Sequence, residues 1–239
     1  MRFSMLAAAA VLGLAGVSVQ AEAAVLSARV YEGNVLQALT GTSTTGALTL
    51  NGATTNFSSI SINAFGTPFT PEPSLIAQNT TISTNTGFSS PTTIRIELTQ
   101  TDLSSASARA GGLLAQFVTT FTANMLVNGA SISDITLSTY ADATNVAYGT
   151  TNLLATTTYG TGSPAATPAI MRNVALGNAL FSETLVISAT FNAGAAGLNT
   201  STQITASPAP VAVPEPASIA LFSTGLLAVG MLSRRRRQG

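Results

Sequence analysis

The sequence contains no cysteine, histidine, tryptophan or lysine, and all nine of its basic residues are arginine. Without cysteine the chain has no disulfide, thiolate nucleophile or cysteine-ligated zinc site. The absence of histidine excludes a Ser-His-Asp triad, and the absence of lysine excludes a Ser-Lys dyad. Neither a P-loop nor a strand-linked Gly-x-Gly-x-x-Gly fingerprint is present. We therefore expect no cofactor, no metal site and no catalytic residue, and we interpret the chain as a non-enzyme.

Charged residues are also scarce, at 8% of the chain against about 25% in an average soluble domain. From residue 24 to residue 213 the chain has four arginines and seven acidic residues, a net charge of −3. No basic patch is available for phosphates, so we expect no nucleic-acid partner. The one common hydrolytic design that remains is a pair of carboxylates, which would make the chain a secreted carbohydrate-active enzyme. The candidate sets are Glu97 with Asp102, or Asp134 with Asp142 and Glu183.

The N-terminal segment has the three parts of a secretory signal peptide. Arg2 supplies the positive start, an apolar run follows from Met5 to Val17, and Ala21-Glu22-Ala23 resembles a cleavage site. The run is about 13 residues long, which is short for the ~20 residues that span a bilayer. We predict cleavage after Ala23, or alternatively after Ala21, and we exclude residues 1–23 from the fold.

The C-terminal segment also has three parts. It begins with Val213, Pro214, Glu215 and Pro216, continues with about 16 mostly apolar residues, and ends in the cluster Arg234, Arg235, Arg236 and Arg237. A helix of that length is about 24 Å long, slightly less than the ~30 Å hydrocarbon core. The positive-inside rule keeps the arginine cluster in the cytoplasm, so a single transmembrane helix would leave the preceding domain outside.

This arrangement resembles the PEP-CTERM sorting signal over residues 213–237. The resemblance implies recognition by exosortase, an integral-membrane processing enzyme of Gram-negative bacteria. It further implies cleavage near Pro214–Pro216, loss of the helix, and transfer of the product to the cell surface or the extracellular matrix. Exosortase systems are associated with exopolysaccharide and biofilm production. The alternative is a simple membrane-anchored surface protein whose C-terminal helix is never removed.

The chain contains a second copy of the tripeptide, at Pro71-Glu72-Pro73. A polar sequence follows it, without an apolar span or an arginine cluster. We therefore predict that this copy is an ordinary proline-rich loop. The sorting signal is therefore indicated by the succession of tripeptide, apolar span and arginine cluster, and not by the tripeptide alone.

Residues 24–206 are predicted to form an all-β exported domain, a β-sandwich or a jelly-roll-like fold. Residues 93–99 alternate cleanly, with Ile94, Ile96 and Leu98 on one face and polar residues on the other. The alternation of residues 131–140 shifts once, which indicates a β-bulge near Ser133–Asp134. The predicted strands are residues 25–31, 47–50, 57–62, 93–99, 116–127, 131–140 and 183–191. Residues 116–127 are long enough for one strand or a bent pair.

Turn and loop residues separate these strands. Asn51-Gly52 and Asn128-Gly129 are strong hairpin-turn dipeptides. Long loops are predicted over residues 66–91 and 142–169, where Thr, Gly, Pro and Ser dominate. Residues 207–213 read as a proline-rich stalk before the sorting signal at residues 214–237.

The sequence thus predicts a protein exported across the inner membrane, anchored there transiently, and then released to the cell surface or the extracellular space. Its expected partners are exosortase, the membrane through the C-terminal helix, and exopolysaccharide. Its expected role is non-enzymatic, as a structural or adhesive component of the matrix.

Overall fold

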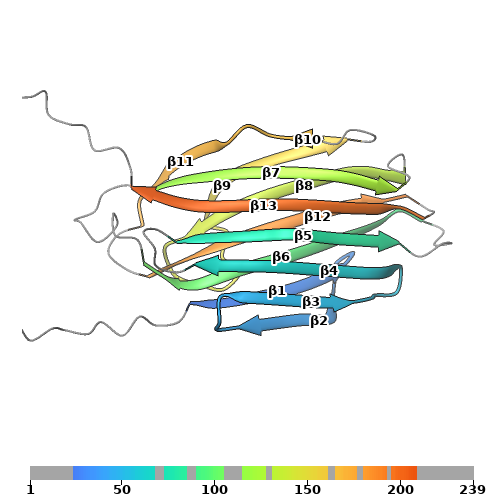
Figure 1. Ribbon diagram of the computed structural model, residues 1–239, viewed down its shortest axis with the longest axis horizontal. Helices are drawn as coiled ribbons and strands as arrows, with labels where there is room; N and C mark the ends of the chain where they lie inside the picture. Colours follow the sequence, from blue (N-terminus) through green and yellow to red (C-terminus); the bar gives the residue numbers. More distant parts are fainter. Residues whose placement is uncertain are drawn as a thin grey trace, which may run out of the picture.

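The protein is a two-layer, all-antiparallel β-sandwich in the computed structural model, as predicted (Figure 1). The structure describes residues 24–67, 73–84, 90–104, 115–127, 131–160, 165–176, 180–192 and 195–208. Sheet A contains, in spatial order, β2 (Val35–Ser43), β1 (Val25–Glu32), β6 (Thr92–Leu103), β12 (Phe181–Phe191), β8 (Ile132–Asp142) and β9 (Asn152–Gly160). Sheet B contains β10 (Ala165–Ala166), β7 (Ala115–Val127), β13 (Gly197–Pro208), β5 (Ser74–Thr84), β4 (Phe57–Thr67) and β3 (Ala47–Gly52), and β11 (Ile170–Val174) also pairs with β7.

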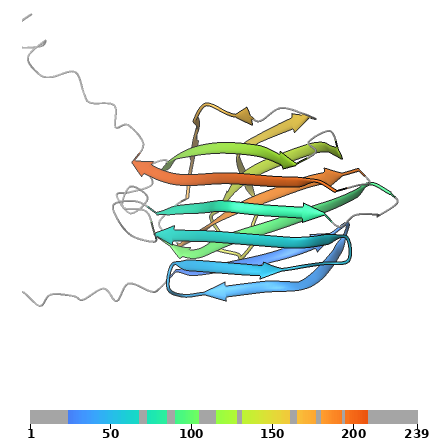
Figure 2. The ribbon, with the colours of Figure 1, turned by 45° about the vertical axis from the view of Figure 1, so that its right-hand side comes forward.

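The chain passes repeatedly between the two sheets, because consecutive strands such as β5 and β6, β7 and β8, and β12 and β13 belong to opposite layers. Both ends of the described chain lie at the same end of the sandwich, where β1 begins and β13 ends (Figures 1 and 2). The described chain therefore ends, at Pro208, at one end of the strands. The two broad outer faces of the sandwich run parallel to the strands.

Three local predictions are confirmed. The alternation of residues 93–99 is realised in β6, where Ile94, Ile96 and Leu98 are buried. Residues 115–127 form one continuous strand rather than a bent pair. The bulge in β8 lies where the parity shift predicts it, because Thr190 pairs with Asp134 and Phe191 with Ile132, which leaves Ser133 as the extra residue.

The two long loops predicted over residues 66–91 and 142–169 are wrong, since they contain β5 and β9. In β5 the buried, inward-facing positions are shared by apolar residues and threonines. They are Leu75, Ala77, Thr80, Ile82 and Thr84. The hydrophobic pattern is therefore incomplete in the sequence, although the strand is regular.

The hairpin turn predicted at Asn51-Gly52 is also wrong. Gly52 is the last residue of β3 and pairs with Ile60, while the chain turns afterwards, where the Thr54 amide donates to the Phe57 carbonyl at 2.9 Å. A Cβ at Gly52 would lie 2.6 Å from Leu39 Cδ1. Gly52 thus allows close packing against the Leu39 side chain of β2, which a larger residue would have to displace, and it does not form a turn. Asn128-Gly129 lies outside the described residues.

The interior consists of two apolar clusters, each joined across the sheets by an edge-to-face phenylalanine pair. The ring centroids of Phe57 and Phe191 are 5.2 Å apart, and those of Phe117 and Phe181 are 6.0 Å apart. Between the clusters, four strands carry inward threonines, which we call the threonine belt. The belt consists of Thr80 on β5, Thr119 on β7, Thr139 on β8, and Thr200 and Thr202 on β13.

The strand β13 extends to Pro208, two residues into the predicted stalk. The predicted signal peptide at residues 1–23, the rest of the stalk and the sorting segment lie outside the described residues. Within the described part of the chain, no helix is long and apolar enough to cross a membrane. The predicted C-terminal transmembrane helix belongs to the segment that is not described.

Candidate functional site: the outer face of sheet A

The outer face of sheet A has mostly polar side chains, arranged in rows across five strands. This follows from period-2 alternation, because Leu26, Ala28 and Val30 of β1 are buried and the residues between them face outward. One row contains Tyr31, Arg95, Ser188, Thr136 and Thr158. The next contains Arg29, Glu97, Val186, Ser138 and Thr156.

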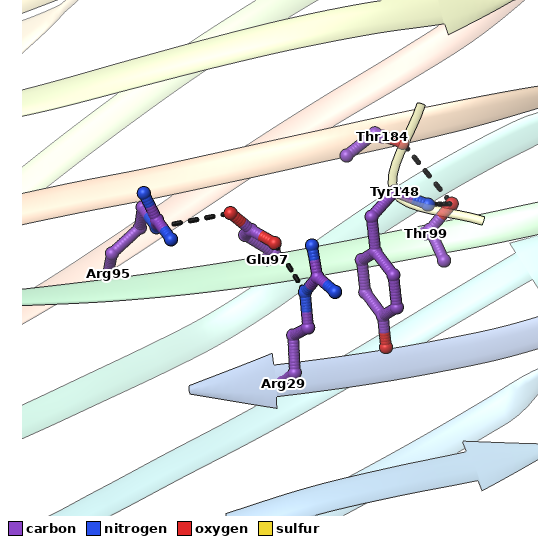
Figure 3. A network of polar contacts seen from close by, with 6 residues as sticks. All are labelled: Arg29, Arg95, Glu97, Thr99, Tyr148 and Thr184. Carbon is purple, nitrogen blue, oxygen red and sulfur yellow. Dashed lines mark hydrogen bonds and ion pairs between the residues drawn. The ribbon is translucent and has the colours of Figure 1, made fainter. Parts of the chain in front are cut away.

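At one side of this face, two arginines hold one carboxylate between them (Figure 3). Arg29 Nε donates to Glu97 Oε2 at 2.5 Å, and Arg95 Nε lies 3.1 Å from Glu97 Oε1. The exposed fraction is 33% for the Arg29 side chain and 38% for Arg95, but only 11% for Glu97. The negative charge is therefore shielded, whereas about a third of each arginine side chain is exposed to solvent.

Two tyrosines hold these guanidinium groups in place. Arg29 Cζ lies 3.9 Å from the centroid of the Tyr148 ring and 5.4 Å from that of Tyr31, and Arg95 Cζ lies 4.2 Å from the Tyr31 centroid. These are cation–π distances. Burial raises the pKa of the Tyr148 phenol, an effect that the positive charge of Arg29 opposes. We call Arg29, Tyr31, Arg95, Glu97 and Tyr148 the arginine–tyrosine cluster.

Tyr148 reaches the cluster because the connection between β8 and β9 folds back over sheet A. Its backbone amide donates to Thr99 Oγ1 at 3.2 Å, and Ser182 Oγ donates to the Val146 carbonyl at 2.8 Å. Tyr148 has a φ of 60°, a left-handed conformation that costs a non-glycine residue roughly 1–2 kcal/mol. Contacts around the loop offset this cost.

Asp142 supplies the main anchor of that loop. Its carboxylate accepts hydrogen bonds from the Thr144 amide at 2.8 Å, from Thr144 Oγ1 at 2.5 Å and from Thr151 Oγ1 at 2.6 Å. Burial acts to raise the pKa of Asp142, but these hydrogen bonds outweigh burial and hold the pKa below its ordinary value.

A second anchor joins the loop to β6. Asn145 Nδ2 donates to Asp102 Oδ1 at 2.7 Å, and the Asp102 amide donates to Asn145 Oδ1 at 2.8 Å. Asp102 Oδ1 and both carboxylate oxygens of Asp142 thus hold the loop, while Asp102 Oδ2 accepts a hydrogen bond from Thr101 Oγ1 at 3.0 Å.

The acids considered for paired-carboxylate chemistry are not brought together. Glu97 and Asp102 are five residues apart on β6, about 16 Å at ~3.3 Å per residue, and Asp134 and Asp142 lie at opposite ends of β8, about 26 Å apart. A glycosidase needs its two carboxyl groups within about 5–10 Å. Glu183 points into the sandwich interior, whereas Asp142 lies on the outer side of sheet A.

Glu183 is the most unusual of these acids. It is fully buried, and neither carboxyl oxygen has a hydrogen-bond partner in the described structure. Burial raises the pKa of its carboxyl well above the ordinary value. In the described part of the chain, no group of three or more acidic side chains is placed to hold a metal ion.

Sequence reasoning missed the arginine–tyrosine cluster. The alternation of residues 25–31 and 93–99 does place Arg29, Arg95 and Glu97 on polar faces. What the sequence does not show is that β1 and β6 are neighbours in a register that puts Arg29 opposite Glu97. The position of Tyr148 could not be predicted from the sequence, because this residue belongs to a loop that folds over the sheet.

Comparison with known proteins bears on the C-terminal segment. A family model described as the PEP-CTERM protein-sorting motif matches residues 212–237. The match includes the predicted sorting motif, Val213, Pro214, Glu215 and Pro216, and the arginine cluster, Arg234, Arg235, Arg236 and Arg237, all outside the described residues. No curated protein matches the chain. The motif indicates a protein that is exported, anchored in the membrane and then processed by exosortase. The C-terminal segment of the chain therefore carries a PEP-CTERM protein-sorting motif.

Proposed function

We propose that the exported domain is a non-enzymatic component of the cell surface or extracellular matrix that associates with exopolysaccharide through the outer face of sheet A. The observation that carries this proposal is the row arrangement of uncharged hydroxyl groups beside one arginine–tyrosine cluster. The sorting motif supports an encounter with the matrix outside the cell.

The chemistry of this face suits a long polyhydroxylated ligand. Thr136 Oγ1 and Thr158 Oγ1 are 3.1 Å apart on the outer side, so neighbouring strands present a pair of hydroxyls that can donate and accept hydrogen bonds. In the next row Thr156 is exposed, and its Oγ1 lies 2.8 Å from the Oγ of the buried Ser138. Sugar hydroxyls have the same dual capacity. A face whose side chains are in register across several strands can repeat such contacts along a polymer, and many weak contacts along one chain add up to useful avidity.

The placement of the termini is compatible with this use. The described chain ends at Pro208, at one end of the strands (Figure 2), and the matched sorting motif follows later in the sequence. The broad outer face of sheet A lies along the side, so attachment at that end leaves the face available to a polymer.

The separation of the acids supports a role other than catalysis. Each of Glu97, Asp102 and Asp142 is held by donors of its own, and Glu183 is enclosed in the interior. Paired-carboxylate hydrolysis requires two acids in one groove with separated pKa values.

The test uses mature protein recovered from the surface or the medium of its native host, incubated with the exopolysaccharide of that host. We expect the protein to co-sediment with the polymer, and size-exclusion chromatography to show an unchanged polymer length. Protein that remains in the supernatant would contradict the association. A progressive shortening of the polymer would contradict the non-enzymatic role.

A further inference from the structure

We infer that the arginine–tyrosine cluster binds the carboxylate groups of an acidic polysaccharide, that is, a polymer containing uronic acid units. This inference rests on the proposed association with exopolysaccharide and specifies the chemical class of the ligand.

The first argument is the local charge. Two guanidinium groups share one carboxylate, so the cluster has a net charge of +1 within a domain that is negative overall. Arg29 Nε donates a hydrogen bond to Glu97 Oε2, whereas Arg95 Nε lies at ion-pair distance from Glu97 Oε1, 3.1 Å, without forming a hydrogen bond. Within the described residues, neither arginine side chain makes any other hydrogen bond. The terminal Nη groups thus remain as donors for an external acceptor.

The second argument is the difference in exposure. The carboxylate of Glu97 is covered, while about a third of each arginine side chain reaches solvent. An approaching ligand meets the cations first, and an anion is favoured over a neutral or cationic group.

The third argument is preorganisation. Arg29 is held against Tyr148, and Arg95 against Tyr31, so neither side chain has to be immobilised on binding. A guanidinium that lies against a ring keeps its N–H edge free for a bidentate carboxylate. The tyrosine rings are engaged by the arginines, so recognition by stacking a sugar on a bare ring is less favoured than recognition of charge.

The surroundings match a saccharide rather than a nucleic acid. The cluster continues across the sheet into Ser188, Thr136 and Thr158, which offer hydroxyls to a sugar chain. The next charged side chain on this face, Asp134, lies two strands from β6, about 10 Å away laterally. Two arginines in a domain of net charge −3 cannot follow a continuous phosphate backbone.

The experiment compares two forms of one polymer, polygalacturonate and its methyl ester, which differ only in the charge of the carboxyl group. The mature protein is titrated with each form at low salt, and duplex DNA serves as a third probe. We expect binding to polygalacturonate that weakens with added salt, and no comparable binding to the methyl ester or to DNA.

Variants locate the site. Arg95→Gln removes one exposed guanidinium and is expected to weaken binding by about tenfold or more, the effect of losing a charge-assisted pair. Arg172→Gln is the matched control, because Arg172 is exposed on β11 of sheet B, away from the cluster. Glu97→Gln keeps an acceptor for Arg29 but removes the competing charge, so it is expected to strengthen binding. Thermal unfolding of each variant verifies that it is folded.

The outcomes separate this inference from the proposed function. Equal binding to polygalacturonate and its methyl ester, or equal losses for Arg95→Gln and Arg172→Gln, would overturn the inference and leave the association with polysaccharide in place. Weaker binding by Glu97→Gln, or tighter binding to DNA than to polygalacturonate, would also overturn it. Failure to bind any polysaccharide, including that of the host, would contradict both the recognition of uronic acid units and the proposed association with exopolysaccharide.

Discussion

Glu183 and Gln100 are cross-strand partners on β12 and β6, and both side chains are enclosed in the sandwich interior. In the described structure, neither Glu183 carboxyl oxygen nor Gln100 Oε1 has a hydrogen-bond partner. A buried carboxylate without a partner is costly, whereas a protonated carboxyl can donate to a neighbouring amide oxygen. Glu183 is thus expected to be protonated in the folded protein.

The first prediction concerns the pH dependence of stability. In the unfolded chain the Glu183 carboxyl titrates near about 4.3, and burial raises its pKa in the folded state. Between these values the folded state binds one proton more than the unfolded state. The contribution of Glu183 to the free energy of unfolding should therefore be highest below the unfolded pKa and fall by about 1.4 kcal/mol per pH unit as the pH rises toward the folded pKa.

Urea denaturation of the wild type and of Glu183→Gln across this pH range measures the effect. The variant has no ionisable group at this position, so its free energy of unfolding should not show this fall with rising pH. Asp134→Asn removes a carboxyl whose described hydrogen bond comes from Ser133 Oγ at 3.4 Å, and it should retain the decline. A wild-type profile parallel to that of Glu183→Gln would show that Glu183 does not carry the extra proton.

The threonine belt gives a second prediction, in which two similar substitutions act in opposite directions. Thr200 is fully buried and its hydroxyl has no partner in the described structure, so Thr200→Val should raise the free energy of unfolding by about 1 kcal/mol. Thr119 Oγ1 and Thr139 Oγ1 are 3.1 Å apart across the two sheets, so Thr119→Val should lower it by about 1 kcal/mol. Chemical denaturation measures both. A loss in Thr200→Val would mean that a buried water completes the hydrogen bonding of this hydroxyl.

The belt also explains how far the fold could be predicted from the sequence. Strands whose inward residues are aliphatic, such as β6 and β12, were predicted because period-2 alternation is visible in them. The strand β5 was missed because Thr80 and Thr84 face inward. Threonine has the β-branched shape that a strand favours, but its hydroxyl makes an inward position look like a surface position.

The candidate site was less predictable than the fold, for a different physical reason. Alternation along one strand places Arg29 or Glu97 on a face, but the ion pair depends on which strands are neighbours. β1 and β6 are separated by four strands in the chain, and their pairing depends on the whole topology. The acidic residues show the opposite error. Glu97 and Asp102, or Asp134 and Asp142, are near each other in the sequence, but the extended strands β6 and β8 keep their carboxyl groups apart.

A third prediction concerns the loop that positions Tyr148. Asp142→Asn weakens the acceptor that holds Thr144 and Thr151 and should lower the free energy of unfolding at neutral pH by about 1–3 kcal/mol. Because the folded pKa of Asp142 is depressed, its contribution is present above the unfolded pKa, near about 3.9, and is lost as the pH falls through the folded pKa.

Limited proteolysis between residues 143 and 151 provides the local readout for this variant. Faster cleavage there is expected in Asp142→Asn, with the rest of the sandwich intact. Thr150→Val, an exposed change within the same loop, is the matched control and should be cleaved at the wild-type rate. Equal cleavage of Asp142→Asn and the wild type would contradict the anchoring role of this carboxylate.

The last prediction uses the second Pro-Glu-Pro tripeptide as an internal control for sorting. Pro214-Glu215-Pro216 belongs to the matched sorting motif, whereas Pro71-Glu72-Pro73 stands before β5, where the Pro73 carbonyl accepts a hydrogen bond from the Ala206 amide at 2.9 Å. Replacing Glu215 and Pro216 by alanine should block processing, because we expect the enzyme to recognise the tripeptide together with the apolar span and the arginine cluster that follow it. Intact mass spectrometry of protein from each cell fraction should then find the C-terminal arginines retained in the membrane. The same replacement at Glu72 and Pro73 should leave the mature mass ending near Pro214–Pro216, apart from the mass of the substitution. Loss of processing in both variants would mean that the tripeptide acts through folding, and normal processing in both would mean that the tripeptide is not the signal.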